Sequence, residues 1–128
     1  KNITVSSKVS TKHGLVLFNW IKSEIVELTE SILLEKFPDK HVKKIRISNS
    51  FSYWGSCNTK DSVNIDWRLI FAPSYVLSYI IIHELCHLTE FNHGHKFWDL
   101  VDSKMVDRKR SQNWLKKNAN YLYRIRFN

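Results

Sequence analysis

The stretch from Pro73 to about Phe91 constrains the fold most, because it reads as one helix that is almost wholly apolar over residues 75–82. Pro73 suits the first turn of a helix, and Asn92 and Gly94 follow where the helix should end. A helix with apolar side chains all round is buried on most sides. We therefore expect this helix to run through the middle of the domain, with other elements packed around it.

The other elements are read from apolar periodicity, with steps of three and four for helices and of two for strands. Helices are expected over 14–37, from His95 and around Trp114, and strands over 42–48, 52–57, 62–67 and 121–127. The pair 52–57 and 62–67 flanks a polar turn, which is typical of a β-hairpin. The sequence thus predicts helices and strands mixed in one α+β domain.

The length of 128 residues allows one core but not two. Residues 1–13 are polar and aperiodic, so we expect a lead-in followed by a single domain over 14–128, the C-terminal part of a longer protein. The longest uncharged stretch, 69–82, is too short and too interrupted to cross a membrane. Two cysteines, Cys57 and Cys86, make no disulfide framework, and we expect buried free thiols in a cytoplasmic protein.

The run His83-Glu84-Leu85-Cys86-His87 carries the clearest chemistry in the chain. On a helix, His83 and His87 lie on one face and can present two imidazoles to one metal ion. Glu84 follows the first ligand and can reach a water on that metal as a general base. Three ionisable groups on a buried helix are costly unless something engages them, and a zinc ion would.

A hydrolytic zinc site needs a third protein ligand and one open position. His93, His95, Glu90 and Asp99 are the candidates from the residues alone. We favour His93, because Gly94 permits a backbone turn that would aim it back at the helix. His95 lies where the next helix should begin, and we expect it at the surface or near the site.

Several motifs, spread in order over about residues 41–105, resemble the YgjP-like zinc metallopeptidase domain, which is similar to SprT-like peptidases. They are Tyr53-Trp54-Gly55-Ser56-Cys57, Asn64-Ile65-Asp66-Trp67-Arg68-Leu69, Ala72-Pro73, His83-Glu84-Leu85-Cys86-His87, Asn92-His93-Gly94 and Phe97-Trp98. Three departures stand out: Tyr53 replaces the usual Arg, Asp66 replaces a common Asn, and His95 is an additional histidine.

The resemblance implies a small α+β zincin-like fold, with a short antiparallel sheet packed against the buried HExxH helix plus three further helices. It also implies Zn²⁺ held by His83, His87 and His93, with Glu84 catalytic. The predicted function is zinc-dependent hydrolysis of peptide bonds in a peptide or protein substrate. The donor that stabilises the oxyanion is not named by the sequence; the candidates for this or another substrate contact are His95, Arg68, Tyr75 and Tyr79.

The charge of +8 leaves a second reading open. Residues 102–128 carry eight basic and two acidic side chains, whereas residues 71–101 carry one and three. A basic end can contact nucleic acid weakly, or it can be a solvated face. The alternative function is therefore a basic nucleic-acid-binding module with a structural or vestigial zinc, although such a module has no need of Glu84.

Overall fold

A computed structural model describes residues 4–5, 11–58 and 62–127 of the chain. Its longer helices are α1 (Thr11–Lys36), α2 (Ser74–Cys86), α3 (His95–Lys104) and α4 (Arg108–Tyr123), and a 3₁₀ helix, η1, spans Trp67–Phe71. The strands are β1 (Thr4–Val5), β2 (Lys44–Ser48), β3 (Gly55–Asn58), β4 (Ser62–Asp66) and β5 (Arg126–Phe127). The predicted fold class, α+β with α2 and three further α-helices, is confirmed for the described residues.

The central sheet has the strand order β2-β4-β3. Strand β3 pairs antiparallel with β4, as the predicted hairpin requires, but β2 runs parallel to β4. The expectation of an antiparallel sheet is therefore wrong for this edge. The chain leaves β2, crosses to the far edge to form β3, and then inserts β4 between them, which sets β2 and β4 in the same direction.

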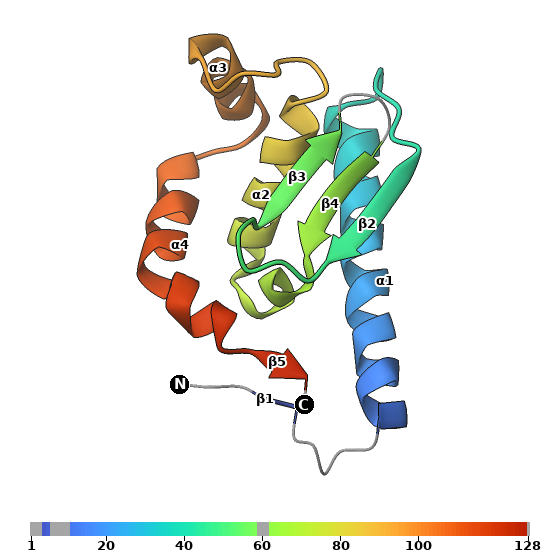
Figure 1. Cartoon of the computed structure of the whole chain (residues 1–128). Helices are drawn as coiled ribbons and strands as arrows, with labels where there is room; N and C mark the ends of the chain where they lie inside the picture. Colours follow the sequence, from blue (N-terminus) through green and yellow to red (C-terminus); the bar gives the residue numbers. More distant parts are fainter. Residues whose placement is uncertain (1–3, 6–10, 59–61, 128) are drawn as a thin grey trace.

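Helix α2 is the buried centre of the domain, as its apolar sequence predicts. Figure 1 shows α1 and α2 side by side behind the sheet, with α4 on the other side of α2. Ile81 and Leu85 on α2 have no exposed surface, and Ile21 and Ile25 on α1 are equally covered. The core thus lies between the sheet and these helices, and it fixes the C-terminal end of α2 against β3.

Three element boundaries differ from the predictions. Helix α1 begins at Thr11, inside the expected lead-in, and β1 pairs with β5 in a separate two-stranded parallel sheet. Helix α2 ends at Cys86 rather than near Phe91, because the next three residues turn with tighter i to i−3 hydrogen bonds. The strand expected over 121–127 forms over Arg126–Phe127 alone, since α4 continues to Tyr123.

The extension of α4 has a packing cause. Ser111, Leu115 and Leu122 are its buried side chains, and their spacing of four and seven places them on one helical stripe. The alternation of large and charged residues that predicted a strand over 121–127 therefore includes the last turn of this helix. In the described part of the chain, no helix combines the length and the apolar character needed to cross a bilayer.

Candidate metal centre

Three histidine side chains converge at the C-terminal end of α2. His83 lies in the last turns of this helix, His87 is its C-cap residue, and His93 comes from the turn before α3. Nε2 of His93 lies 3.1 Å from Nε2 of His87 and 3.2 Å from Nε2 of His83. We call these three residues the His cluster; among the described residues, they form the group that can hold a metal ion.

The donor set of the His cluster fits a divalent metal. Bonds of about 2.0–2.1 Å from a tetrahedral zinc would separate two nitrogen ligands by about 3.3 Å. The two printed nitrogen separations are close to this value. Burial, together with the neighbouring His87 and His93, lowers the pKa of His83 to about 4, and burial also lowers the pKa of His87. Both rings are thus neutral at pH 7, the form that binds metals.

Hydrogen bonds to the remaining ring nitrogens orient two rings of the His cluster. Nδ1 of His87 lies 3.0 Å from the carbonyl oxygen of Glu90, so this nitrogen carries the proton and leaves Nε2 free. Nδ1 of His83 lies 3.3 Å from the hydroxyl oxygen of Tyr79, which accepts a hydrogen bond from Nε2 of Gln112 at 3.0 Å. Helix α4 therefore helps to orient a ring on α2.

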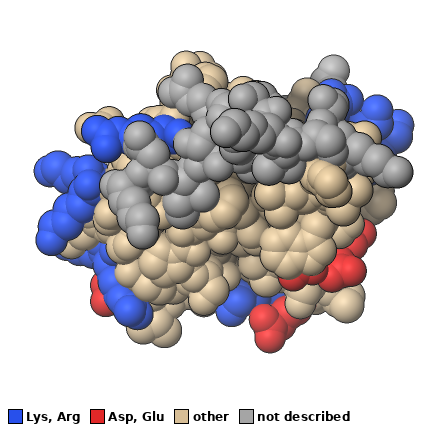
Figure 2. All heavy atoms as spheres, turned by 90° about the horizontal axis from the view of Figure 1, so that it is seen from below, with Lys and Arg blue, Asp and Glu red and all other residues tan. Residues whose placement is uncertain are grey.

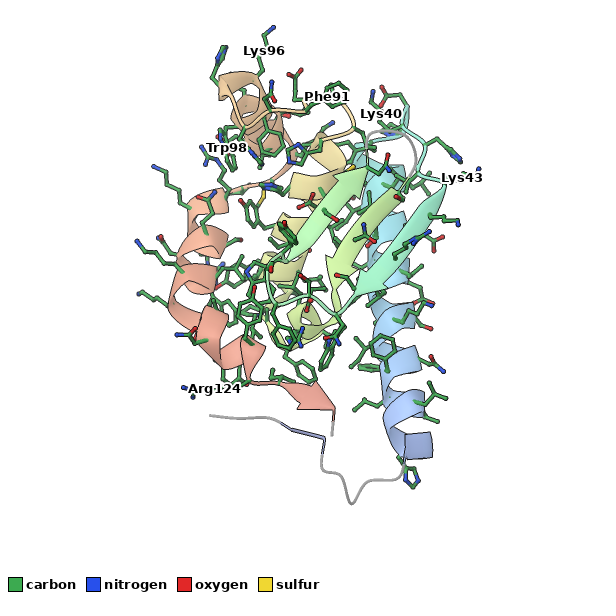
Figure 3. The ribbon with its side chains drawn as sticks, viewed as in Figure 1. Lys40, Lys43, Phe91, Lys96, Trp98 and Arg124 are labelled. Atoms are coloured by element: carbon green, nitrogen blue, oxygen red, sulfur yellow. The ribbon has the colours of Figure 1, made fainter. Side chains whose placement is uncertain are left out.

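Aromatic rings of α3 support the His cluster. Phe97 is fully buried and stacks on His87 with ring centroids 4.4 Å apart. Trp98, labelled in Figure 3, stacks on His93 with a centroid distance of 5.8 Å. Apolar contacts with α3 consequently hold one side of the histidine rings, which restricts the rotamers of these side chains.

Glu84 is the buried carboxylate of the site. Its Oε2 lies 4.0 Å from Nε2 of His83, and burial raises the pKa of Glu84 to about 7. Gly55 on β3 packs directly against it: a methyl group at Gly55 would lie 2.8 Å from Cγ of Glu84 and 3.0 Å from the carbonyl oxygen of Asn64. The absence of a side chain at Gly55 therefore makes room for the carboxylate.

A cleft of about 410 Å³ opens between β3 and the end of α2. Gly55, Ser56 and Cys57 line it from the strand, and Glu84 and the His cluster line it from the opposite side. Two exposed aromatic residues, Tyr53 and Phe91, complete its lining. The convergent histidines and the buried carboxylate thus face one accessible space beside a sheet edge.

The sequence matches the family model described as "YgjP-like, metallopeptidase domain" over residues 4–118. The chain belongs to the YgjP-like family. A metallopeptidase domain of this family implies a divalent metal, in agreement with the donor set at the end of α2. No curated protein matches the sequence.

Two solved structures have a fold similar to that of this YgjP-like chain. The metallopeptidase zymogen jannalysin of Methanocaldococcus jannaschii is 20% identical, with a TM-score of 0.60, and the match covers 77% of this chain and 96% of that one. The metallopeptidase zymogen abylysin of Pyrococcus abyssi is 22% identical, with a TM-score of 0.57 and coverage of 77% and 91%. Both matches are similarities of fold.

Arg68, a candidate for substrate contact, is instead part of a buried network in this YgjP-like domain. It is 1% exposed, and its NH1 lies 3.2 Å from Oδ1 of Asp66. It also donates hydrogen bonds to the carbonyl oxygens of Ser50 and Ile125 and to Oδ1 of Asn49. These contacts use the donors of Arg68 inside the core, which favours a structural role over the candidate role in substrate contact.

The other three candidates for oxyanion or substrate contact also lie outside the lining of the cleft. Tyr75 has the guanidinium of Arg110 3.9 Å from its ring centroid. Tyr79 lies behind His83, and its hydroxyl contacts Nδ1 of that ring rather than the open side of the cleft. His95 is exposed at the start of α3 and lines a different hollow.

Sequence reasoning missed several residues of the YgjP-like site. Cys57 was expected to be buried, whereas it is half-buried and lines the cleft; burial, with a smaller effect of Glu84, raises the pKa of its thiol to about 11. Cys86 is a buried free thiol, as expected. The reason given for His93 is wrong in one step, because Gly94 has φ −81° and requires no glycine. Gly55 lies on β3 and Glu84 on α2, so their contact leaves no periodic pattern in the sequence.

Proposed function

We propose that this protein is a zinc-dependent metallopeptidase that hydrolyses peptide bonds, with His83, His87 and His93 as zinc ligands and Glu84 as general base. The observation that carries the proposal is the convergence of three imidazoles and one buried carboxylate on a single cleft. Among the described residues, the group of candidate ligands has three members, whereas structural zinc sites usually have four. This difference favours a catalytic site over a structural one.

Zinc held by these nitrogens would supply Lewis acidity, polarising the substrate carbonyl and making a water molecule a better nucleophile. Glu84 accepts the proton of the attacking water and delivers it to the nitrogen of the departing amine. Its burial keeps the pKa near 7, which suits a group that both accepts and donates a proton at neutral pH. Tyr79 and Glu90 hold the rings of His83 and His87 in the required orientation.

The edge of β3 is suited to bind the substrate backbone. Strand β3 is the edge of the sheet, and the amide of Asp66 on β4 donates to the carbonyl oxygen of Trp54 just before it. Because hydrogen-bonded pairs alternate in an antiparallel ladder, the backbone groups of Gly55 and Cys57 point toward the free edge. An extended peptide can add to this edge as a further strand and bring its carbonyl to the cleft.

Replacement of Glu84 by Gln tests the proposed base. The amide is nearly isosteric but cannot accept a proton, so peptide hydrolysis should fall by about 100-fold or more. Metal content and the midpoint of urea unfolding should stay at wild-type values. Glu24→Gln, an exposed carboxylate on α1, is the matched control and should behave as wild type. Unchanged turnover of an internally quenched peptide pool by Glu84→Gln would overturn the mechanism.

Chelation and reconstitution test the metal. Three imidazoles suit zinc, whereas Mg²⁺ and Ca²⁺ prefer oxygen ligands. Dialysis against a chelator should abolish peptide hydrolysis, and one equivalent of Zn²⁺ should restore it. Recovery with Mg²⁺ or Ca²⁺ but not with Zn²⁺ would contradict the zinc assignment.

A further inference from the structure

Two exposed aromatic side chains line the cleft of the proposed metal site. Tyr53 is 66% exposed and Phe91 is 63% exposed. Among the large apolar side chains that are exposed in the described part of the chain, these are the two that line this cleft. They come from different elements: Tyr53 precedes β3, and Phe91 lies in the turn after α2, where Figure 3 labels it at the upper end of the molecule.

Neither ring is needed for the core. Trp54, next to Tyr53, stacks on Tyr123 with ring centroids 4.4 Å apart, so this segment is anchored by the tryptophan. Tyr53 and Phe91 pack against no other aromatic ring of the described chain and lie outside the hydrophobic core. Two unpartnered rings beside one cleft are an exposed apolar surface of the kind that marks binding sites.

The charge of the cleft agrees with an apolar ligand. Its described lining contains one carboxylate, that of Glu84, and neither lysine nor arginine. The described lysine and arginine side chains therefore lie elsewhere. Apart from the proposed metal and Glu84, the described lining offers no opposite charge to an acidic or basic substrate side chain. The lining of the cleft is therefore suited to bind bulky, uncharged side chains.

We propose that Tyr53 and Phe91 determine substrate specificity by binding large apolar or aromatic side chains of an extended peptide around the bond to be cleaved. The proposal rests on the proposed peptidase function and names its substrate class: unfolded or flexible segments that expose such side chains. An exposed ring gains contact area only when a substrate covers it, so each ring contributes affinity without touching the reacting atoms.

Binding to the inactive variant tests this proposal separately from catalysis. In Glu84→Gln, fluorescence anisotropy is measured with labelled decapeptides of Ala and Gly that carry either two Phe, two Ser, two Lys or two Glu residues. The Phe peptide should bind about tenfold more tightly than the Ser peptide, as expected for loss of one good aromatic contact, and the charged peptides more weakly still. Adding Tyr53→Ala or Phe91→Ala should remove most of this preference.

The same substitutions in the active protein should raise KM for the Phe peptide about tenfold and leave kcat and metal content unchanged, the pattern expected when binding is lost equally from substrate and transition state. Val106→Ala, which removes a side chain that is 91% exposed but outside the cleft, is the matched control. The specificity proposal would be overturned if Glu84→Gln bound the Phe and Ser peptides equally, or if it bound none of the peptides. Absence of cleavage by the wild type, with selective binding of the Phe peptide intact, would instead contradict the peptidase function alone.

Discussion

His93 and His95 are two residues apart in sequence, yet the structure separates them. Nε2 of His93 lies within 3.2 Å of the matching nitrogens of His83 and His87, whereas His95 is exposed at the start of α3. We expect His93→Ala to weaken zinc binding by at least about 100-fold, because a three-ligand site has no spare donor. His95→Ala should keep wild-type affinity. A competition titration with a chromophoric chelator decides between them, and zinc loss in His95→Ala with retention in His93→Ala would reverse the assignment.

Gly55 and Gly94 offer a matched pair of glycine substitutions. A methyl group at Gly55 would lie 2.8 Å from Cγ of Glu84, whereas one at Gly94 would have no atom within 4 Å. Gly55→Ala should displace the buried carboxylate and lower kcat by about 10- to 100-fold, since small errors in position are costly in catalysis. Gly94→Ala should leave kcat unchanged. Equal activity of both variants would show that Glu84 adapts to the added methyl group.

The site is predictable from sequence where its geometry is local. A step of four residues on a helix brings His83 and His87 together whatever surrounds them, and Glu84 comes with them. The position of His93 depends on a turn whose end the sequence marks only loosely. The contact between Gly55 and Glu84, and the burial of Arg68, arise from packing between elements far apart in sequence, which periodicity does not report.

At the scale of elements, Asp66 and Arg68 connect β4 and η1 to the rest of the domain. Arg68 bonds to the carbonyl oxygen of Ile125 near the C-terminus, and Asp66 accepts from the amide of Ser50, in the segment that leads toward β3. Oδ1 of Asn49 accepts hydrogen bonds from Nη2 of Arg68 and from Nε1 of Trp67. This network therefore holds together three segments that the sequence keeps apart.

Removal of the arginine should destabilise the fold rather than impair substrate binding. Arg68→Ala leaves Asp66 buried and unpaired, so we expect a loss of about 3–5 kcal/mol in the free energy of unfolding. Urea denaturation followed by circular dichroism measures it. Arg110→Ala, which removes an exposed cation over the ring of Tyr75, should cost less than about 1 kcal/mol. Unchanged stability with lost activity in Arg68→Ala would restore Arg68 as a substrate ligand.

The type of element was predicted correctly for long periodic segments, and the prediction failed where two patterns overlap. The stripe of α1 and the apolar run of α2 allow one interpretation, and both helices form. Residues 121–127 satisfy strand alternation, but their first turn also continues the buried stripe of Ser111 and Leu115, and packing selects the helix. The parallel pairing of β2 depends on the order in which strands join the sheet, which no local pattern encodes.

At the scale of the whole molecule, one group of basic side chains lies on α4. Helix α4 contains Arg108, Lys109, Arg110, Lys116 and Lys117 and no acidic residue. In Figure 2, which shows the molecule from below, Lys and Arg side chains are grouped at the left, the side on which α4 lies in Figure 1, and others lie at the upper right. The described lining of the cleft, in contrast, has no lysine or arginine. Substrate binding and polyanion binding would therefore use different surfaces.

The basic face of α4 should account for any affinity of this protein for nucleic acid. Lys109, Lys116 and Lys117 are exposed and free of a described acidic partner, so they can approach phosphates and release counterions. Binding of a fluorescent 20-base-pair DNA should be weak and should fall steeply between 50 and 200 mM salt, by about tenfold or more for a few phosphate contacts. Exchanging the three lysines for Gln should reduce both the affinity and the salt dependence, whereas exchanging Lys22, Lys40 and Lys43, outside α4, should have a smaller effect. No binding at 20 mM salt, or an equal loss of DNA affinity in the two triple variants, would show that the charge of α4 serves as a solvated surface. Peptide hydrolysis should be unaffected by either triple variant.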